Sequence, residues 1–243
     1  SSAYLRKVKF CDQIILVMAT LYIVATPIGN LEDITLRALR VLKEVDLVLC
    51  EDTRVTKNLL ARYEISKPLE SYHARSDARK LEKIIGLLEE GKNIALVTDA
   101  GTPGISDPGN MLVDELKTRA PEVKVVPIPG ASALTSALSA AGVHAAEFLF
   151  LGFLPHKKGR ETLFKEIAQA ERTVVFYESP HRILKALDSL EKFIGAERQV
   201  VVARELTKIY EEFVHGTVTE VKQHFVTPEK VRGEFVVIIP PQR

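Results

Sequence analysis

The sequence has no tryptophan, only two cysteines, and no apolar run as long as the roughly 20 residues that a membrane-spanning helix needs. Cys11 and Cys50 are too few for a disulfide framework or a cysteine-rich zinc site, and they favour a reducing compartment. The formal net charge is +1, which excludes a protein-wide basic field, so any contact with nucleic acid must be a local patch. We therefore expect a cytoplasmic protein that makes no contact with a membrane.

What is present is a chain of 243 residues with 46% hydrophobic and 27% charged residues, which is typical of a soluble globular protein. This length suits two compact domains better than one. Regular patterning begins after Met18, so we expect residues 1–17 to be a leader outside the fold. Pro129 and Gly130 form a stiff connection, and we expect an N-terminal domain over 18–128 and a C-terminal domain over 129–243.

Short apolar runs alternate with helical periodicity along the whole chain. This alternation predicts an α/β fold with a mainly parallel first sheet, whose strands are buried on both faces. Valine and phenylalanine at near-alternating positions in the last segments indicate an antiparallel component, so we expect the second sheet to be mixed. In the first half we expect strands over 20–25, 46–50, 69–73, 93–98 and 123–128, and helices over 33–45, 52–63, 77–91 and 110–120.

Two loops at expected strand ends are rich in glycine and proline. They read "TPIGN" (26–30) and "GTPGISDPG" (101–109). In an open α/β sheet, ligands bind beyond the carboxyl ends of the strands, and glycine lets the backbone approach a ligand closely. The alternative is that these residues only make tight turns. Neither loop has the spacing of a dinucleotide fingerprint or the lysine of a phosphate-binding loop, which disfavours NAD and ATP.

Six motifs carry a resemblance that covers nearly the whole chain from Met18. In order they are "VATPIGNLEDITLRAL" (24–39), "CEDTR" (50–54), "DAGTPGISDPG" (99–109), "PGASAL" (129–134), "LGFLP" (151–155) and "YESPHR" (177–182). Together they closely resemble the rRNA-methylating branch of the tetrapyrrole methylase superfamily. The resemblance implies two α/β domains with an S-adenosylmethionine cleft between them, and a homodimer. It also implies 2'-O-methylation of a cytidine in the decoding region of 16S rRNA, within the small ribosomal subunit.

The same resemblance implies a set of cofactor-binding residues. S-adenosylmethionine carries a sulfonium, an adenine and a zwitterionic amino-acid end, so a rigid loop that offers backbone groups suits it and no metal is needed. For Phe153 and Tyr177, core packing is an equal alternative. The implied cofactor contacts are Pro27, Gly29, Ala100, Gly101, Thr102, Ile105, Ser106, Ser132, Ala133, Phe153, Leu154, Tyr177, Ala203 and Gly233.

Methylation of a hydroxyl depends on positioning and on a general base that removes its proton. Each base candidate has a structural alternative. Asp52 suits the cap of the helix that follows it, Asp99 suits an Asx turn in its own loop, and Glu178 suits an ion pair with Arg182. The candidates in motifs that match the family are Asp52, Arg54, Asp99, Glu178, Glu205 and Lys208.

Basic residues cluster at three places that are candidates for RNA binding. Such clusters are usually solvated helix faces, and we expect that for Arg62. "PHKKGR" (155–160) differs, because Pro155 and Gly159 place its cations on a loop after "LGFLP". The RNA-binding candidates are Lys157, Lys158 and Arg160, with Arg75 and Arg79 as the second choice.

Two other functions remain open on the sequence. A tetrapyrrole C-methyltransferase would share the fold and cofactor, but would need a wide apolar cleft. A non-enzymatic nucleotide-binding module is the other alternative. No pair of His and Cys has metal-ligand spacing, so we expect no metal.

Overall fold

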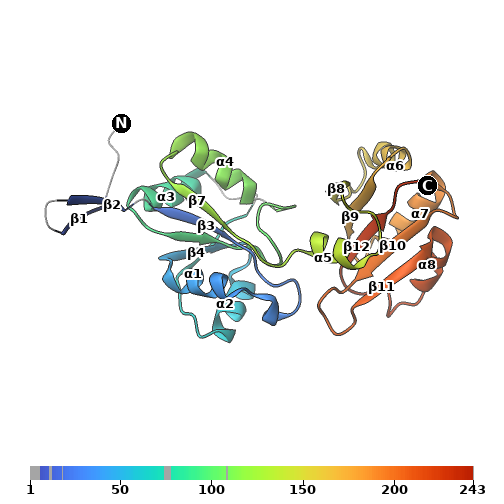
Figure 1. Cartoon of the computed structure of the whole chain (residues 1–243), viewed down its shortest axis with the longest axis horizontal. Helices are drawn as coiled ribbons and strands as arrows, with labels where there is room; N and C mark the ends of the chain where they lie inside the picture. Colours follow the sequence, from blue (N-terminus) through green and yellow to red (C-terminus); the bar gives the residue numbers. More distant parts are fainter. Residues whose placement is uncertain (1–5, 11–12, 18, 74–77, 108, 243) are drawn as a thin grey trace. The chain divides into compact units, whose positions relative to one another are not determined.

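The computed structural model of the chain describes residues 6–10, 13–17, 19–73, 78–107 and 109–242 (Figure 1). It divides into two compact units, Ser1–Ser132 (unit 1) and Ala133–Arg243 (unit 2). The expected division lay between residues 128 and 129. No helix in these described ranges is long and apolar enough to cross a membrane.

Unit 1 is built on a five-stranded sheet in the order β5-β4-β6-β3-β7, and every strand pair in it is parallel. The prediction of a mainly parallel first sheet is confirmed. The strands are β3 (Thr20–Val24), β4 (Leu47–Cys50), β5 (Leu69–Ser71), β6 (Ile94–Leu96) and β7 (Lys124–Ile128). The helices are the 3-10 turn η1 (Leu31–Asp33), α1 (Leu36–Glu44), α2 (Thr53–Arg62), α3 (Ala78–Glu89) and α4 (Gly109–Arg119).

Helices cover both faces of this sheet, as Figure 1 shows. Leu88 of α3 and Leu116 of α4 are buried in one apolar cluster with Leu21 of β3. Leu42 of α1 and Leu60 of α2 are buried in another cluster on the opposite face. Because both faces are covered, the edge where the strands end is left to carry polar groups.

Unit 2 is built on a mixed sheet in the order β11-β10-β12-β9-β8, which confirms the prediction for the second sheet. β8 is parallel to β9, whereas β12 is antiparallel to both β9 and β10, so β8, β9 and β10 run in the same direction. The strands are β8 (Phe148–Phe153), β9 (Thr173–Glu178), β10 (Gln199–Arg204), β11 (Glu212–Thr217) and β12 (Phe235–Ile239). The helices are α5 (Ala133–Ala140), α6 (Arg160–Ala168), α7 (Ile183–Ile194) and α8 (Val218–His224).

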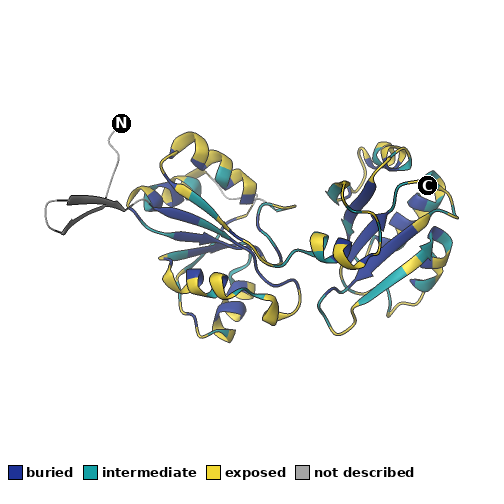
Figure 2. Cartoon of the chain, in the orientation of Figure 1, coloured by how far each residue is buried: buried dark blue, intermediate teal, exposed yellow. Residues whose placement is uncertain are grey.

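The core of unit 2 lies between the sheet and helices α6, α7 and α8, and the strands at its centre are almost entirely buried (Figure 2). Phe164 of α6, Leu187 of α7 and Val221 of α8 contribute to it. The carboxyl ends of β8, β9 and β10 meet at one edge of the sheet, because the three strands share a direction. β8 ends within the motif "LGFLP" and β9 ends within "YESPHR", so both motifs lie at this edge.

Residues 1–17 contain regular structure, although the sequence analysis expected them to lie outside the fold. β1 (Arg6–Phe10) pairs with β2 (Gln13–Val17) in an antiparallel hairpin, with Val8 opposite Ile15. The hairpin forms a two-stranded sheet separate from the five-stranded sheet of unit 1.

Candidate active site

The structure brings the two glycine- and proline-rich loops of unit 1 together. Thr26 and Gly101 form an antiparallel bridge, in which the Thr26 amide lies 2.9 Å from the Gly101 carbonyl and the reverse hydrogen bond is 3.1 Å. The buried Thr26 hydroxyl also donates to the Thr98 carbonyl at 3.0 Å. The loops after β3 and β6 are therefore fixed to each other by uncharged groups.

The 99–109 loop is also held from within. Asp107 accepts hydrogen bonds from the amides of Gly104 (2.7 Å) and Gly109 (2.8 Å), and so closes the loop onto the start of α4. Thr102 donates its hydroxyl to the Ala131 carbonyl at 3.1 Å, which ties the loop to the "PGASAL" segment. Gly101 has φ +88°, a conformation that favours glycine. The sequence analysis did not single out Asp107, although an aspartate two residues before the helix start is a turn-forming signal.

The predicted cofactor contacts of unit 1 surround these loops. Gly101 and Pro27 are buried, whereas Gly29, Ala100, Ile105 and Ser106 are exposed. The edge offers peptide groups, hydroxyls and the exposed side chain of Ile105, and these fit a cofactor that brings its own charges. The remaining predicted residues here, Thr102 and Ser132, are half-buried.

Carboxylates gather at the ends of β4 and β6 in unit 1. The Asp52 amide donates to Asp99 Oδ1 at 3.1 Å, and Thr98 donates its hydroxyl to Glu51. The Asp99 carboxylate therefore accepts a hydrogen bond from the backbone of the segment that follows β4. The carboxylate of Asp99 is exposed at this edge.

Asp52 is committed to Arg54 and to the start of α2. It accepts from the Arg54 amide at 2.8 Å and from the Arg54 guanidinium at 2.6 Å. These hydrogen bonds lower the pKa of Asp52 to about 2, and those from the Arg54 side chain have a larger effect than the one from its amide. The predicted helix cap is confirmed. A carboxylate of such low pKa is a weak general base at neutral pH.

In unit 2, Glu178 ends β9 with a fully buried carboxylate between two arginines. Arg182 Nη2 lies 2.8 Å and Arg160 Nη1 lies 3.8 Å from its oxygens. The arginines donate to successive carbonyls of the loop after β8, Arg182 to Leu154 (2.9 Å) and Arg160 to Pro155 (3.2 Å). The ion pair predicted as the alternative role of Glu178 is confirmed. We call Glu178, Arg160 and Arg182 the buried charge cluster.

The buried charge cluster changes the interpretation of Arg160. Burial lowers the pKa of its guanidinium, which also lies over the Phe164 ring at 5.1 Å. Its Nε and Nη2 are buried without a hydrogen-bond partner in the described structure, as is Glu178 Oε2. The placement of Arg160 on an exposed basic loop is therefore wrong. Gly159, at φ +81°, turns the chain so that Arg160 begins α6 and faces inward.

The other predicted cations are in different positions. Lys157 and Lys158 are exposed on the loop between β8 and α6, and Arg79 is exposed on α3. Arg75 lies outside the described residues. The structure therefore places two of the five RNA-binding candidates together on one accessible loop.

The loop after β10 is held by a second set of charges. Lys208 Nζ lies 2.8 Å from Glu205 and 2.9 Å from Glu234. Burial opposes the ionisation of both Glu205 and Lys208. The hydrogen bond between the two residues and their hydrogen bonds with Glu234 outweigh this effect. The pKa of Glu205 is therefore lowered and the pKa of Lys208 is raised. Lys208 is thus a bound cation rather than a base. The sequence analysis missed Glu234, which lies 26 residues from Lys208 along the chain.

Left-handed backbone marks the same loop. Glu205 and Thr207 have φ of 51° and 67°, and Gly233 has φ +100°. A Cβ at Gly233 would come within 2.4 Å of the Glu205 side chain, which explains the glycine at that position. Ala203, a predicted cofactor contact, is fully buried inside the sheet.

Aromatic side chains connect the remaining predicted contacts of unit 2. The Tyr177 hydroxyl accepts from the Leu134 amide at 3.0 Å, which joins β9 to the "PGASAL" segment that includes Ala133. The Phe153 ring lies 5.4 Å from the Tyr177 ring and is 56% exposed. Leu154 is buried in the core. For Phe153, this exposure favours a ligand contact over core packing.

The described residues contain no cluster of three or more His, Cys, Asp or Glu arranged as metal ligands. Cys50 is a buried free thiol, and burial raises its pKa.

Two solved structures that share this fold are named as methyltransferases. Cobalt precorrin-4 methyltransferase superimposes with a TM-score of 0.68 at 20% identity, covering 91% of this chain and 94% of that one. Uroporphyrin-III C-methyl transferase from Thermus thermophilus, solved in complex with S-adenyl homocysteine, superimposes with a TM-score of 0.63 at 20% identity, covering 91% and 97%. At this identity the likeness establishes the fold alone.

Sequence relatives are much more similar. Ribosomal RNA small subunit methyltransferase I of Thermotoga maritima is 49% identical over 222 residues, which is 91% of this chain and 98% of that protein. The Bacillus subtilis protein of the same name is 45% identical over 223 residues, which is 91% of this chain and 75% of that protein. Residues 20–222 match the tetrapyrrole (corrin/porphyrin) methylases. The chain therefore belongs to the tetrapyrrole methylase family, in the group of the small-subunit rRNA methyltransferases I.

Proposed function

We propose that the protein transfers the methyl group of S-adenosylmethionine to the 2'-hydroxyl of a cytidine in the decoding region of 16S rRNA. The observation that carries this proposal is the 45–49% identity, over about nine-tenths of the chain, to proteins named for methylation of small-subunit rRNA. The proposed substrate is the RNA within the small ribosomal subunit, which places the reaction in the cytoplasm.

In this proposal the loops after β3 and β6 bind the cofactor. The Thr26–Gly101 bridge and the Asp107 hydrogen bonds hold the backbone of these loops in one shape, so their peptide groups are oriented before the ligand arrives. Ile105, which is 49% exposed, offers an apolar surface on the same loop. S-adenosylmethionine, when bound, supplies an electrophilic methyl group. The cleft expected between the two units stays a prediction.

We assign the general base to Asp99. Of the candidate carboxylates, Asp52 is held by Arg54, Glu178 is fully buried, and Glu205 is held by Lys208. Asp99 is exposed, and one of its oxygens is oriented by the Asp52 amide. The other oxygen is then available to take a proton from a hydroxyl within hydrogen-bond distance.

A tetrapyrrole C-methyltransferase is the second candidate, since the two superimposed structures are named cobalt precorrin-4 methyltransferase and uroporphyrin-III C-methyl transferase. Their 20% identity supports the fold only, whereas the relatives named for rRNA are more than twice as similar. We also propose that the protein acts as a homodimer, as the family resemblance implies.

Methyl transfer from labelled S-adenosylmethionine to small ribosomal subunits that lack the modification tests the proposal, with naked rRNA and uroporphyrinogen as alternative acceptors. Digestion of the product should yield 2'-O-methylcytidine, and Asp99→Asn should lose most of the turnover while it still binds the cofactor. Glu64→Gln, at an exposed residue of the same unit, is the matched control. Methylation of uroporphyrinogen alone would establish the second candidate, and copurified cofactor without transfer to any acceptor would indicate a binding module.

A further inference from the structure

A pocket of about 770 Å³ lies entirely within unit 2, at the edge of the sheet opposite the buried charge cluster. It is lined by the end of α7, the start of β10, His215 of β11, the segment after β12 and residues 141–144. β10 starts in this pocket and ends at Arg204, beside the Glu205 loop, so roughly 17 Å of strand separates the two edges. The volume lies within the range of small-molecule sites.

Arg198 brings a guanidinium to the pocket. Burial lowers the pKa of its guanidinium, and Nη2 donates to the Pro240 carbonyl at 2.6 Å. Within the described residues Arg198 has no ion pair, although the exposed Glu197 lines the same pocket. A guanidinium partly withdrawn from water without a counter-ion favours an anion beside it.

Other arginines of unit 2 provide an internal comparison. Arg182 lies 2.8 Å from Glu178, and Arg204 lies 2.7 Å from Glu212. Arg160 is also within 3.8 Å of Glu178. Each of these shielded guanidiniums faces a carboxylate, whereas Arg198 faces the pocket and a neutral carbonyl.

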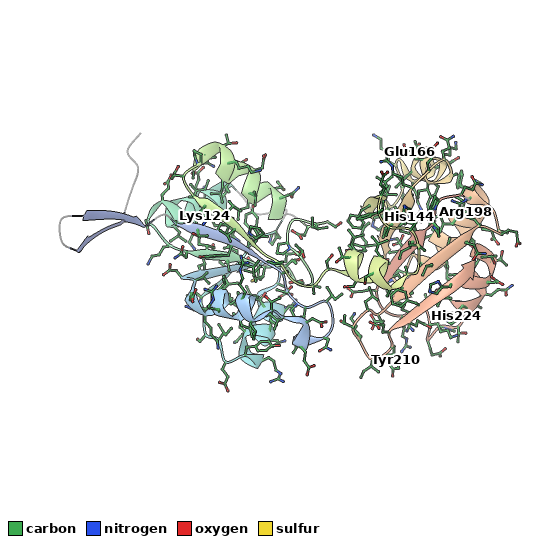
Figure 3. The ribbon with its side chains drawn as sticks, in the orientation of Figure 1. Lys124, His144, Glu166, Arg198, Tyr210 and His224 are labelled. Carbon is green, nitrogen blue, oxygen red and sulfur yellow. The ribbon has the colours of Figure 1, made fainter. Side chains whose placement is uncertain are left out.

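Two histidines add hydrogen-bonding groups from separate segments. His144 precedes β8 and His215 lies on β11, and both line the pocket with exposed side chains. Figure 3 labels His144 and Arg198 in this region of unit 2. Val143 and Ile194 contribute apolar surface. Imidazole and guanidinium groups bind phosphate oxygens and stack on bases, and the apolar surface suits a ribose or base.

We propose that this pocket binds a nucleotide unit, with its phosphate on Arg198 and the two histidines and its base on the apolar wall. Single-stranded RNA and free nucleoside monophosphates share this chemistry. The inference goes beyond the proposed methylation and does not depend on it, because the pocket shares no residue with the candidate active site.

Proton NMR of the six histidine rings of the full chain tests the proposal, with His144→Ala and His215→Ala used for assignment. Cytidine 5'-monophosphate should shift the signals of both rings, and cytidine without the phosphate should shift them much less. Arg198→Gln should weaken binding of the monophosphate roughly tenfold or more, because hydrogen bonds to charged groups are strong. Lys124→Gln, which removes an exposed cation of unit 1, is the matched control and should bind as the wild type does.

Competition by a short oligocytidylate distinguishes the two sources. Displacement of the monophosphate would assign the pocket to an RNA nucleotide, and failure to compete would assign it to a free nucleotide. If Arg198→Gln alters the fold through its contact with Pro240, titration calorimetry measures the affinity of the His144→Ala/His215→Ala double variant for the monophosphate, since that variant lacks the two reporter rings. Unshifted histidine signals at millimolar monophosphate, or wild-type affinity in both variants, would overturn the proposal.

Discussion

The functional edges of the two units are built from different kinds of interaction. In unit 1 the loops are joined by peptide hydrogen bonds and threonine hydroxyls, as at Thr26, Gly101 and Thr102. In unit 2 the loops are joined by ion pairs, which are buried at Glu178 and partly exposed at Lys208. The two loops of unit 1 thus hold each other without ion pairs between their described residues, although the carboxylates of Asp52 and Asp99 lie at the neighbouring strand ends, whereas ion pairs fix the loops of unit 2. The comparison predicts that removing a charge reduces the stability of unit 2, and that straining the backbone reduces the stability and cofactor affinity of unit 1.

Glu178→Ala should have the largest effect. It leaves Arg160 and Arg182 without their counter-ion, and breaking a buried ion pair from one side costs about 3–5 kcal/mol. Urea unfolding followed by circular dichroism measures the loss, since the chain has no tryptophan. The control is Glu161→Ala, whose exposed pair with Lys165 should contribute less than about 1 kcal/mol. Equal effects of the two variants would show that the buried charge cluster does not hold unit 2 together.

Gly101→Val should reduce stability by about 1–3 kcal/mol and abolish S-adenosylmethionine binding, because a β-branched residue is strained at φ +88°. The space itself is not the obstacle, since an added Cβ would meet Ile28 Cγ2 at an ordinary 3.5 Å. Titration calorimetry measures the affinity. Gly86→Ala in α3, where a Cβ meets nothing within 4 Å, is the control and should stabilise the protein slightly. Full cofactor affinity in Gly101→Val would remove this loop from the site.

Lys157→Gln combined with Lys158→Gln should weaken binding to small ribosomal subunits and leave cofactor affinity unchanged. Each lost phosphate contact should lower the slope of log affinity against log salt by about 1, so the double variant should lower it by about 2. Lys165→Gln with Lys185→Gln removes two exposed lysines from helices α6 and α7 and is the control. If both double variants show the same slope as the wild type, Lys157 and Lys158 are solvated residues without RNA contacts.

Arg54→Gln should have the smallest effect, a rise in the pKa of Asp52 from about 2 toward its ordinary value of 3.8. Because the pKa is lowered on folding, the stabilisation that Asp52 provides is present above about pH 4 and is lost as the pH falls through about 2. Carboxyl NMR of the wild type and the variant measures the two midpoints. Identical midpoints would mean that Arg54 does not hold the carboxylate in solution.

Much of the fold was predictable because hydrophobic periodicity reports local structure directly. The parallel first sheet, the mixed second sheet and the Asp52 cap follow from runs and spacings that span a few residues. The turn from β11 into α8 also had a local signal, the capping box of Thr217 and Glu220, which the sequence analysis did not use.

The contacts that were missed depend on residues far apart in the sequence. Arg160 belongs to a basic run, and its carboxylate partner Glu178 lies on β9, which the sequence around Arg160 does not reveal. Glu234 approaches Lys208 because β12 lies beside β10. No pattern around either residue encodes its partner, because tertiary packing of the strands creates the pair.

The five-stranded sheets of the two units differ in how far apart their paired strands lie along the chain, and this distance affects how each sheet can form. β10 and β11 are joined by residues 205–211 and pair directly, so unit 2 can begin with a local hairpin. In the five-stranded sheet of unit 1 the neighbours β4 and β5 are separated by α2, and Thr20 of β3 pairs with Lys124 of β7. The chain loses conformational entropy when such long loops close, before the hydrogen bonds between the paired strands stabilise the sheet. Unit 1 leaves the ribosome first because it is N-terminal, yet its five-stranded sheet has a higher entropic barrier to its first strand pair than the sheet of unit 2.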